Sequence, residues 1–295
     1  MRLRALFRGI LCLVSAGKPF RARPKPLRRS KISRFVHGWA LVTGAAREVG
    51  LGYAFARQLA VEGLNLVLVD ILDEELHARA DELRREFGIE VHTATCDLGA
   101  PAPYAALEEA VDGLDVDVLV CNHMFTPSDT PPILDMSLET HSRMIDINAR
   151  AYTNLIHRFG SEMRNRRRGA IIVVASGAGL TSAPYTGAYA ANKAFQIALG
   201  EALWYELRDS GVDVLVMIGG LMNTQGDALV KYPRWMIAET APVVREVLSA
   251  VGRKAMVIPG FPSRAFLFVQ TRLMSRQRAI SSIGRFMASG LGKTE

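Results

Sequence analysis

Short apolar runs alternate with longer amphipathic segments along most of this chain. The runs hold four to seven residues each, are rich in valine, leucine and isoleucine, and are typical of buried strands. They cover 39–43, 65–69, 91–96, 116–121, 170–174, 212–218 and 255–258. Strands that alternate with helices predict a parallel sheet covered by helices on both faces. We therefore expect one α/β domain, built as a three-layer, doubly wound parallel sheet.

The segments between these runs carry helix signals. Helices are predicted over 53–62, 73–87, 188–208 and 242–251, and over a segment that includes 152–163, where apolar residues recur at i, i+3, i+4, i+7 and i+11. Gly88 is a stop signal for the second helix, and Ser137 begins a capping box before the 152–163 segment. Residues 190–207 are apolar around most of the helix, which one sheet face does not explain. This pattern predicts a subunit interface.

The net charge of +7 belongs to the N-terminus. Residues 1–38 hold eleven lysines and arginines and no acid, and subtracting these eleven from the 36 in the chain leaves 25 basic residues against 29 acidic ones. The remaining chain is therefore mildly acidic, and nothing in it indicates a nucleic-acid surface. We expect residues 1–38 to be a poorly ordered basic tail, followed by a domain over 39–261 and a basic amphipathic extension over 262–295.

Several interpretations of the tail remain open. Its longest unbroken apolar run, 10–14, is too short to span a bilayer. A disordered arm, a mitochondrial-type presequence, a membrane-surface anchor and a start codon assigned too early all fit. The cysteines Cys12, Cys96 and Cys121 show no paired spacing, and the histidines show no ligand spacing, so no disulfide framework or metal site is expected. A reducing compartment, the cytoplasm, is the resulting expectation, with membrane association or a mitochondrial location as alternatives.

A glycine-bearing turn over 43–52 joins the first strand to the first helix. Gly44, Gly50 and Gly52 would let the backbone approach a pyrophosphate, whose charge a helix N-terminus stabilises. An ordinary loop between a strand and a helix fits the turn alone equally well.

Asp70 ends the second strand, eighteen residues after Gly52. A dinucleotide-binding fold places there the acid that binds the adenosine ribose hydroxyls. A carboxylate at that position repels a 2′-phosphate and favours NAD over NADP. Arg47 in the glycine turn suits a 2′-phosphate, so NADP remains open.

Ser176, Tyr189 and Lys193 form the strongest candidate for chemistry. The apolar strand 170–174 leads to the serine, and a helix would place the tyrosine and the lysine on one face, one turn apart. A nearby ammonium favours the phenolate, so we expect a lowered tyrosine pKa and proton exchange with a substrate oxygen near neutral pH. A surface pair of tyrosine and lysine is the simpler alternative for this spacing alone.

Several candidate residues follow strand ends. The glycine turn, Asp70, Asp97, Asn122 and Ser176 each come at the carboxyl end of a predicted strand. Ligands of doubly wound sheets bind outside those ends, so this coincidence indicates one shared site.

Over residues 38–260 the chain resembles the short-chain dehydrogenase/reductase family. The turn resembles its Thr-Gly-x3-Gly-x-Gly motif with five residues instead of three between the first two glycines, and residues 219–224 resemble Pro-Gly-x3-Thr with Gly219 in place of the proline. Residues 121–124 stand where the family has Asn-Asn-Ala-Gly, and Asn122 is retained. His123, beside it, we interpret as packed or solvent-facing rather than catalytic.

This resemblance implies a Rossmann-like fold, a dimer or tetramer, and defined roles for individual residues. Catalytic roles fall on Asn148, Ser176, Tyr189 and Lys193, with Asn148 holding a water that relays protons to the lysine. Cofactor contacts fall on Gly44, Arg47, Gly50, Leu51, Gly52, Asp70, Asp97, Leu98, Asn122, Tyr189, Lys193 and Thr224. No metal is implied.

Residues 225–240 would form a lid over the substrate. The extension over 262–290 mixes apolar residues with five arginines, and it could pack on the body, cap the pocket, pack in an oligomer or rest on a membrane. The apolar lid and extension favour a lipophilic substrate.

We expect an oxidoreductase that transfers a hydride between NAD and a lipophilic secondary alcohol or ketone, with Tyr189 as general acid/base. An NADPH-dependent 3-oxoacyl or polyketide-type carbonyl reductase is the alternative, and a non-catalytic nucleotide sensor is a third.

Overall fold

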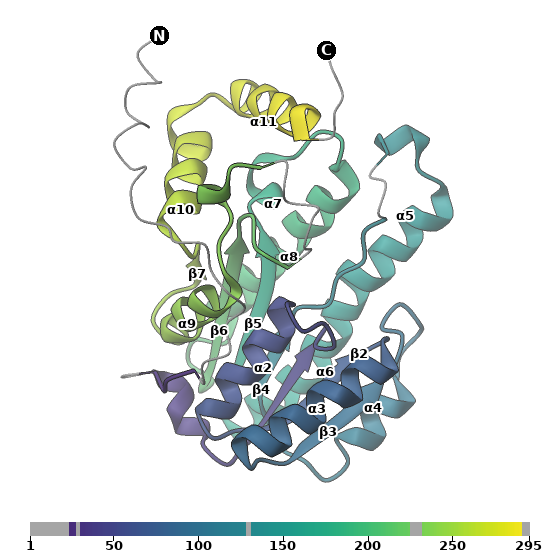
Figure 1. Ribbon diagram of the computed structural model, residues 1–295, viewed down its shortest axis with the longest axis vertical. Coiled ribbons are helices and arrows are strands. Elements are labelled where there is room, and N and C mark those ends of the chain that lie inside the picture. The colour runs from purple at the N-terminus through teal and green to yellow at the C-terminus, as the bar shows by residue number, and fades with distance from the viewer. Residues whose placement is uncertain (1–23, 28–29, 128–130, 225–231, 291–295) are drawn as a thin grey trace.

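Seven parallel strands form one sheet at the centre of the molecule (Figure 1). The computed structural model describes residues 24–27, 30–127, 131–224 and 232–290. The strands are β1 (Trp39–Thr43), β2 (Asn65–Asp70), β3 (Val91–Thr95), β4 (Val116–Cys121), β5 (Gly169–Ser176), β6 (Val212–Gly219) and β7 (Met256–Val257). Their order in the sheet is β3-β2-β1-β4-β5-β6-β7. From β1 the chain adds β2 and β3 on one side and β4 to β7 on the other. The expected doubly wound parallel sheet is therefore confirmed.

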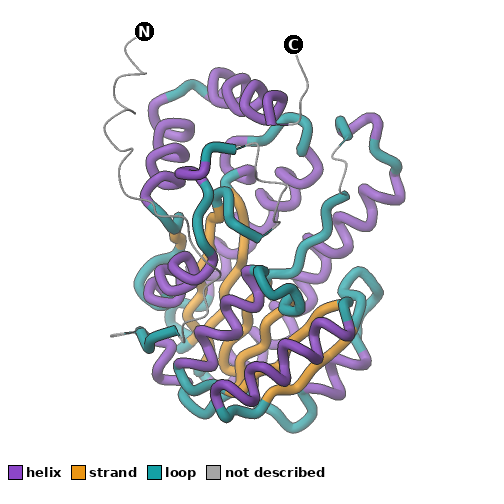
Figure 2. The backbone as a smooth tube through the Cα atoms, in the orientation of Figure 1, coloured by secondary structure: helices purple, strands orange, loops and turns teal. Residues whose placement is uncertain are grey.

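Helices cover both faces of this sheet (Figure 2). The α-helices are α2 (Leu51–Val61), α3 (Asp73–Phe87), α4 (Ala105–Ala110), α5 (Leu138–Ile145), α6 (Ala151–Arg166), α7 (Ala178–Thr181), α8 (Gly187–Glu206), α9 (Thr240–Ala250), α10 (Phe261–Phe268) and α11 (Arg276–Gly290). Short 3₁₀ turns are η2 (Lys31–Phe35), η3 (Ile133–Asp135) and η6 (Arg234–Met236), and π-helical turns are η4 (Asp146–Arg150) and η7 (Val269–Leu273).

Alternation along each strand divides the core into two layers. In β1, Ala40 and Val42 face the cluster built with α2, α3 and α9, whereas Leu41 faces the cluster built with α4, α6 and α8. Successive side chains of a strand point to opposite faces, so strands covered on both faces must be apolar throughout. This requirement explains the uninterrupted apolar runs in the sequence.

Part of the segment assigned above to a disordered tail is packed into the core. Ile32 and Phe35 on η2 are fully buried, and Ser30 caps this turn by accepting a hydrogen bond from the Ile32 amide. Leu27 is also buried, and its amide donates to the Glu62 carboxylate at 2.8 Å. The ordered domain therefore begins before residue 39, because apolar side chains among the arginines complete the layer under α9.

The C-terminal extension is also part of the body. Leu267 on α10 is buried beside Gly177, and Ile283 on α11 packs with Ala183 and Ala190. Arg276 donates hydrogen bonds to the Leu180 carbonyl and to the Ser182 hydroxyl, at 2.6 and 3.1 Å. Packing on the body was one of the open possibilities, and these contacts place α10 and α11 over the segment that follows Ser176 (Figure 1).

Most predicted boundaries agree with the structure within two residues. The first helix begins at Leu51 rather than at residue 53, because Gly50 takes the N-cap position. Ser137 accepts a hydrogen bond from the Thr140 amide, which confirms the predicted cap of α5. Gly88 ends α3 in the left-handed conformation that favours glycine.

Candidate functional site

The glycine turn between β1 and α2 leaves room for a ligand at the start of a helix. Gly44 has a φ of +68°, and a Cβ on Gly52 would collide with the Gly44 carbonyl oxygen. No side chain caps the N-terminus of α2. Amides of an uncapped first turn are donors suited to a pyrophosphate. The turn therefore fits the phosphates of a dinucleotide, and its extra length lies in the exposed residues 47–49.

Asp70 and Asn122 hold this turn from the two neighbouring strands. One Asp70 carboxylate oxygen accepts the Ala46 amide at 3.0 Å, and the other accepts the Ile71 amide at 2.8 Å. The Asn122 side-chain amide donates to the Thr43 and Gly44 carbonyls at 3.0 and 3.2 Å. Both residues thus shape the turn.

Asp97 is engaged by a neighbouring arginine. Its carboxylate accepts hydrogen bonds from the Arg143 guanidinium and the Gly99 amide, both at 2.8 Å. Burial opposes ionisation of this carboxyl, but these two donors outweigh it and lower the pKa of Asp97. Leu98 beside it is buried. These residues lie after β3, at the far edge of the site.

Ser176 ends β5, and Tyr189 and Lys193 lie one turn apart on α8. The Lys193 ammonium is 5.7 Å from the centre of the Tyr189 ring. Its hydrogen bonds go to the Val174 carbonyl at 3.0 Å and to the Gln196 side-chain oxygen at 2.9 Å. The structure therefore brings the three residues together at the carboxyl end of β5.

The pKa values of this pair differ from the sequence expectation. Burial raises the pKa of Tyr189, and hydrogen bonding to Ser176 only partly offsets this effect. Burial also lowers the pKa of Lys193 to about 7, because no carboxylate is bonded to its ammonium. The predicted lowering of the Tyr189 pKa by the lysine is therefore wrong for the protein without cofactor. Burial, rather than the lysine, sets the direction of the Tyr189 pKa shift.

Asn148 lies in the π-helical turn η4, between α5 and α6. Its side chain is fully engaged with Phe125, accepting from the amide at 2.8 Å and donating to the carbonyl at 2.7 Å. Its main-chain carbonyl accepts a hydrogen bond from the Gln196 side-chain amide at 2.7 Å. Turns of this kind redirect backbone groups and are frequent at functional sites.

Sequence reasoning missed Gln196. The residue is fully buried and connects Lys193 to Asn148. The available signal was its position, since a residue three places after the lysine shares its helix face. A glutamine on that inward face has to find polar partners.

His123 is a buried structural residue, as interpreted from the sequence. Its ring nitrogens lie 2.8 Å from the Thr43 hydroxyl and 3.0 Å from the Ile147 carbonyl. The carbonyl can only accept, so the nitrogen facing it carries the proton. Burial lowers the pKa of His123 to about 3, which keeps the ring neutral.

The remaining predicted residues lie at the rim of the site. Arg47 is exposed in the glycine turn. Thr224 is half-buried after β6, and its amide donates to the Met222 carbonyl at 2.8 Å. Residues 225–231 of the predicted lid lie outside the described residues. The rest of the lid includes η6, and Ala238 forms a bridge with Met222.

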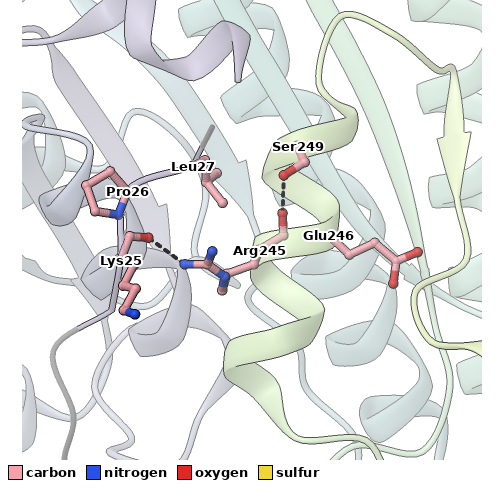
Figure 3. Close-up of a pocket in the computed structure, with 6 residues that line it drawn as sticks. All are labelled: Lys25, Pro26, Leu27, Arg245, Glu246 and Ser249. Carbon is pink, nitrogen blue, oxygen red and sulfur yellow. Dashed lines mark hydrogen bonds between the residues drawn. The ribbon is translucent and has the colours of Figure 1, made fainter. Parts of the chain in front are cut away.

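A separate cavity of about 400 Å³ lies between the N-terminal segment and α9 (Figure 3). It is lined by Lys25, Pro26, Leu27, Arg245, Glu246 and Ser249. None of the residues assigned to catalysis or to cofactor binding lines it. Within the described ranges, no group of three or more histidine, cysteine or acidic side chains could hold a metal ion.

A doubly wound parallel sheet, a glycine turn at the N-terminus of α2 and polar residues at the strand ends define a dinucleotide-binding protein of the Rossmann class. The family model described as short chain dehydrogenase matches residues 38–232. The chain belongs to this family and is an oxidoreductase that acts on CH–OH groups.

Three similar proteins illustrate this relationship. A 7beta-hydroxysteroid dehydrogenase of Collinsella aerofaciens is 32% identical over 75% of this chain and 86% of its own length. A very-long-chain 3-oxoacyl-CoA reductase-like protein of Arabidopsis thaliana is 33% identical over 70% of this chain and 64% of its own length. A solved short-chain dehydrogenase from Sphingobium yanoikuyae in complex with NADPH is 29% identical, with a TM-score of 0.63, over 72% of this chain and 82% of that one.

Proposed function

We propose that this protein transfers a hydride between NAD and the carbinol or carbonyl carbon of a lipophilic secondary alcohol or ketone. The observation that carries the proposal is the convergence of Ser176, Tyr189 and Lys193 at the carboxyl end of β5, on the same sheet edge as the glycine turn. The cofactor supplies or accepts the hydride when it is bound. Asn148 completes the proposed catalytic set, and a nucleotide sensor would have no use for all four residues.

Tyr189, Ser176 and Lys193 have different roles in the proposed proton transfer. In oxidation, Tyr189 takes the hydroxyl proton, and Ser176 hydrogen-bonds the oxygen as it becomes a carbonyl. In reduction, the phenol returns this proton, and its raised pKa suits a donor that stays protonated until substrate arrives. Lys193 contributes positive charge beside the phenol when it is protonated, which favours the phenolate in the transition state.

NAD is the proposed cofactor because Asp70 ends β2 with a carboxylate held against the glycine turn. Gly44, Arg47, Gly50, Leu51, Gly52, Asp97, Leu98, Asn122 and Thr224 complete the proposed set of cofactor contacts. The exposed Arg47 supports the second candidate, an NADPH-dependent 3-oxoacyl reductase, as do the NADPH-bound and 3-oxoacyl-CoA reductase-like relatives. Fluorescence titration with NADH and NADPH separates the two. Arg47→Ala should weaken the binding of NADPH more than that of NADH, because only NADPH carries the 2′-phosphate. Tighter binding of NADPH by the wild type would overturn the NAD assignment.

A lipophilic substrate is supported by the cover over Ser176. Leu267 lies against Gly177, and the Phe286 ring on α11 is tilted against the rings of Tyr232 and Phe266, with centroid distances of 5.2 and 6.2 Å. Apolar and aromatic side chains beside a reactive group favour apolar ligands. The decisive experiment is turnover of a panel of steroid, long-chain and aromatic secondary alcohols and their ketones. We expect activity on at least one lipophilic pair, and activity only on sugars or other polar alcohols would contradict the proposal.

A homodimer or homotetramer is proposed through α8. Exposed residues recur on it at helical spacing, namely Ala191, Ala194, Phe195, Ala198, Glu201, Ala202 and Tyr205. A small-residue face of this kind lets two helices approach closely. Light scattering should give a multiple of 32.3 kDa, and Ala198→Arg should reduce it to one chain.

We also propose that the protein rests on an anionic membrane surface through α10 and η7. Phe261, Phe268, Val269 and Leu273 are exposed along one side of this continuous helix, with Arg264 and Arg272 beside them. Between Glu246 and Glu295 the sequence has eight basic residues and no acidic one. Apolar side chains flanked by arginines suit a negatively charged lipid surface. None of the described helices is long and apolar enough to cross a bilayer.

Vesicle sedimentation tests this contact in the full chain. We expect binding to vesicles that contain phosphatidylserine, little binding to phosphatidylcholine alone, and loss of binding in Phe268→Glu with Leu273→Glu. Leu134→Glu is the matched control, since Leu134 is 95% exposed on η3. Unchanged vesicle binding in the double variant, or a change in oligomeric state instead, would assign this face to another partner.

A further inference from the structure

Gln196 connects two residues of the proposed catalytic set. Its side-chain oxygen accepts a hydrogen bond from the Lys193 ammonium at 2.9 Å, and its side-chain amide donates to the Asn148 carbonyl at 2.7 Å. The residue is 0% exposed, and Lys193 is 3% exposed. The link therefore crosses from α8 to η4 through the interior of the protein.

The chemistry of the two ends explains why a glutamine fits between them. An ammonium is only a donor, and a peptide carbonyl is only an acceptor. A group that bridges them must accept at one end and donate at the other, as an amide or a water molecule can. An apolar side chain would leave both ends without this partner, and leaving a buried polar group unsatisfied is unfavourable.

The Asn148 side chain is directed to Phe125, whose amide it accepts and whose carbonyl it donates to. Its main-chain carbonyl is the group directed to Gln196. The second acceptor of the Lys193 ammonium is the Val174 carbonyl at 3.0 Å, and this carbonyl lies 3.4 Å from the Tyr152 hydroxyl. Lys193 is thus held on the protein side by two fixed acceptors.

We propose that Gln196 is a positioning residue that takes the place of the bridging water between Lys193 and the Asn148 carbonyl. This inference rests on the proposed function. A water molecule can accept one proton and release another, whereas an amide can do so only through its unfavourable imidic acid form. The path from Lys193 toward Asn148 is therefore closed to protons, and the proton that Tyr189 takes from an alcohol must leave on the side of the site that faces the substrate.

Substitutions at this position should move the titration of Lys193 in opposite directions. Gln196→Leu removes one acceptor of the ammonium and should lower its pKa from about 7 by at least one unit. Gln196→Glu places a carboxylate beside it and should raise that pKa by at least one unit. The titratable groups around Lys193 are Tyr189 on α8, Tyr152 on α6 and the neutral His123 after β4.

The titration is measured in the cofactor-free protein by ¹⁵N NMR of the lysine ammonium, and then in the pH dependence of kcat. A crystal structure of cofactor-free Gln196→Ala should contain a water within hydrogen-bonding distance of both Lys193 Nζ and Asn148 O. A Lys193 titration that is the same in the Leu and Glu variants as in the wild type, or an Ala variant without this water, would overturn the proposal.

Turnover measurements test the proposed function, whereas the NMR and crystallographic measurements test the role of Gln196. A wild type without any turnover refutes the oxidoreductase assignment of the site, and the NMR and crystallographic results still decide the role of Gln196. If Gln196→Leu does not fold, the Glu and Ala variants give the same decision.

Discussion

Two neighbouring regions of the sheet use polar side chains in different ways. Around β1, β2 and β4, Asp70 and Asn122 hold the backbone of the glycine turn, and their partners are main-chain amides and carbonyls. Around β5 and α8, Lys193 and Gln196 are buried and bonded to each other as well as to main-chain carbonyls. The first region shapes a binding surface out of backbone, and the second keeps reactive groups away from water.

This difference has an energetic consequence. A carboxylate that accepts amide hydrogen bonds at a strand end stabilises the turn it holds. A lysine in the interior without a bonded carboxylate costs free energy whenever it carries a charge. The hydrogen bonds of Asp70 therefore stabilise the glycine turn, whereas the buried Lys193, proposed to act in catalysis, reduces stability when it is charged.

Tyr189→Phe should have the largest effect and should separate the two regions. We expect kcat to fall about 10³- to 10⁴-fold, because the proton donor is removed while the ring remains. NADH affinity, measured by fluorescence, should change less than threefold. Preserved turnover would remove Tyr189 from the mechanism.

Gly52→Ala should disrupt the glycine turn between β1 and α2. The added methyl group meets the Gly44 carbonyl oxygen, a backbone atom that can move only with the whole turn. We expect coenzyme affinity to weaken roughly 100-fold, or about 3 kcal/mol, at the upper end of the usual cost of overpacking. The matched control is Gly160→Ala in α6, where the nearest atom is the flexible end of Ile171 at 3.2 Å. Equal coenzyme affinities in these two variants would contradict the proposed role of the turn.

Lys193→Met should change how the free energy of unfolding depends on pH. The folded pKa of about 7 lies below the ordinary lysine value, so between pH 7 and 10.5 the unfolded chain binds a proton that the folded protein does not. The wild type should therefore gain about 2 kcal/mol relative to the variant between pH 7 and pH 9. Below pH 7 this penalty is fully present. Urea unfolding at several pH values measures the free energy of unfolding of both proteins. If it changes with pH by the same amount in the two proteins, Lys193 is not buried with its charge.

Sequence patterns predicted much of the fold for physical reasons that are local. Strands buried on both faces must be apolar throughout, so β1, β2 and β4 were visible as runs, and Gly88 marked a helix end through its left-handed conformation. The tail was harder to interpret. Ile32 and Phe35 lie among arginines, and only the space under α9 explains why these two side chains are buried.

In the candidate site, too, some properties could be predicted from the sequence and others could not. Identity and spacing placed Ser176, Tyr189 and Lys193 in one group, because a helix fixes which residues share a face. The sequence alone thus determined the fold class, the strand ends at which the site lies and the residue types available for chemistry. The tertiary structure decided how those groups are charged and connected: burial set the pKa values of Tyr189 and Lys193, and the approach of α8 to η4 made Gln196 a bridge. Desolvation and hydrogen bonds between distant segments depend on the packed fold, so no local pattern encodes them.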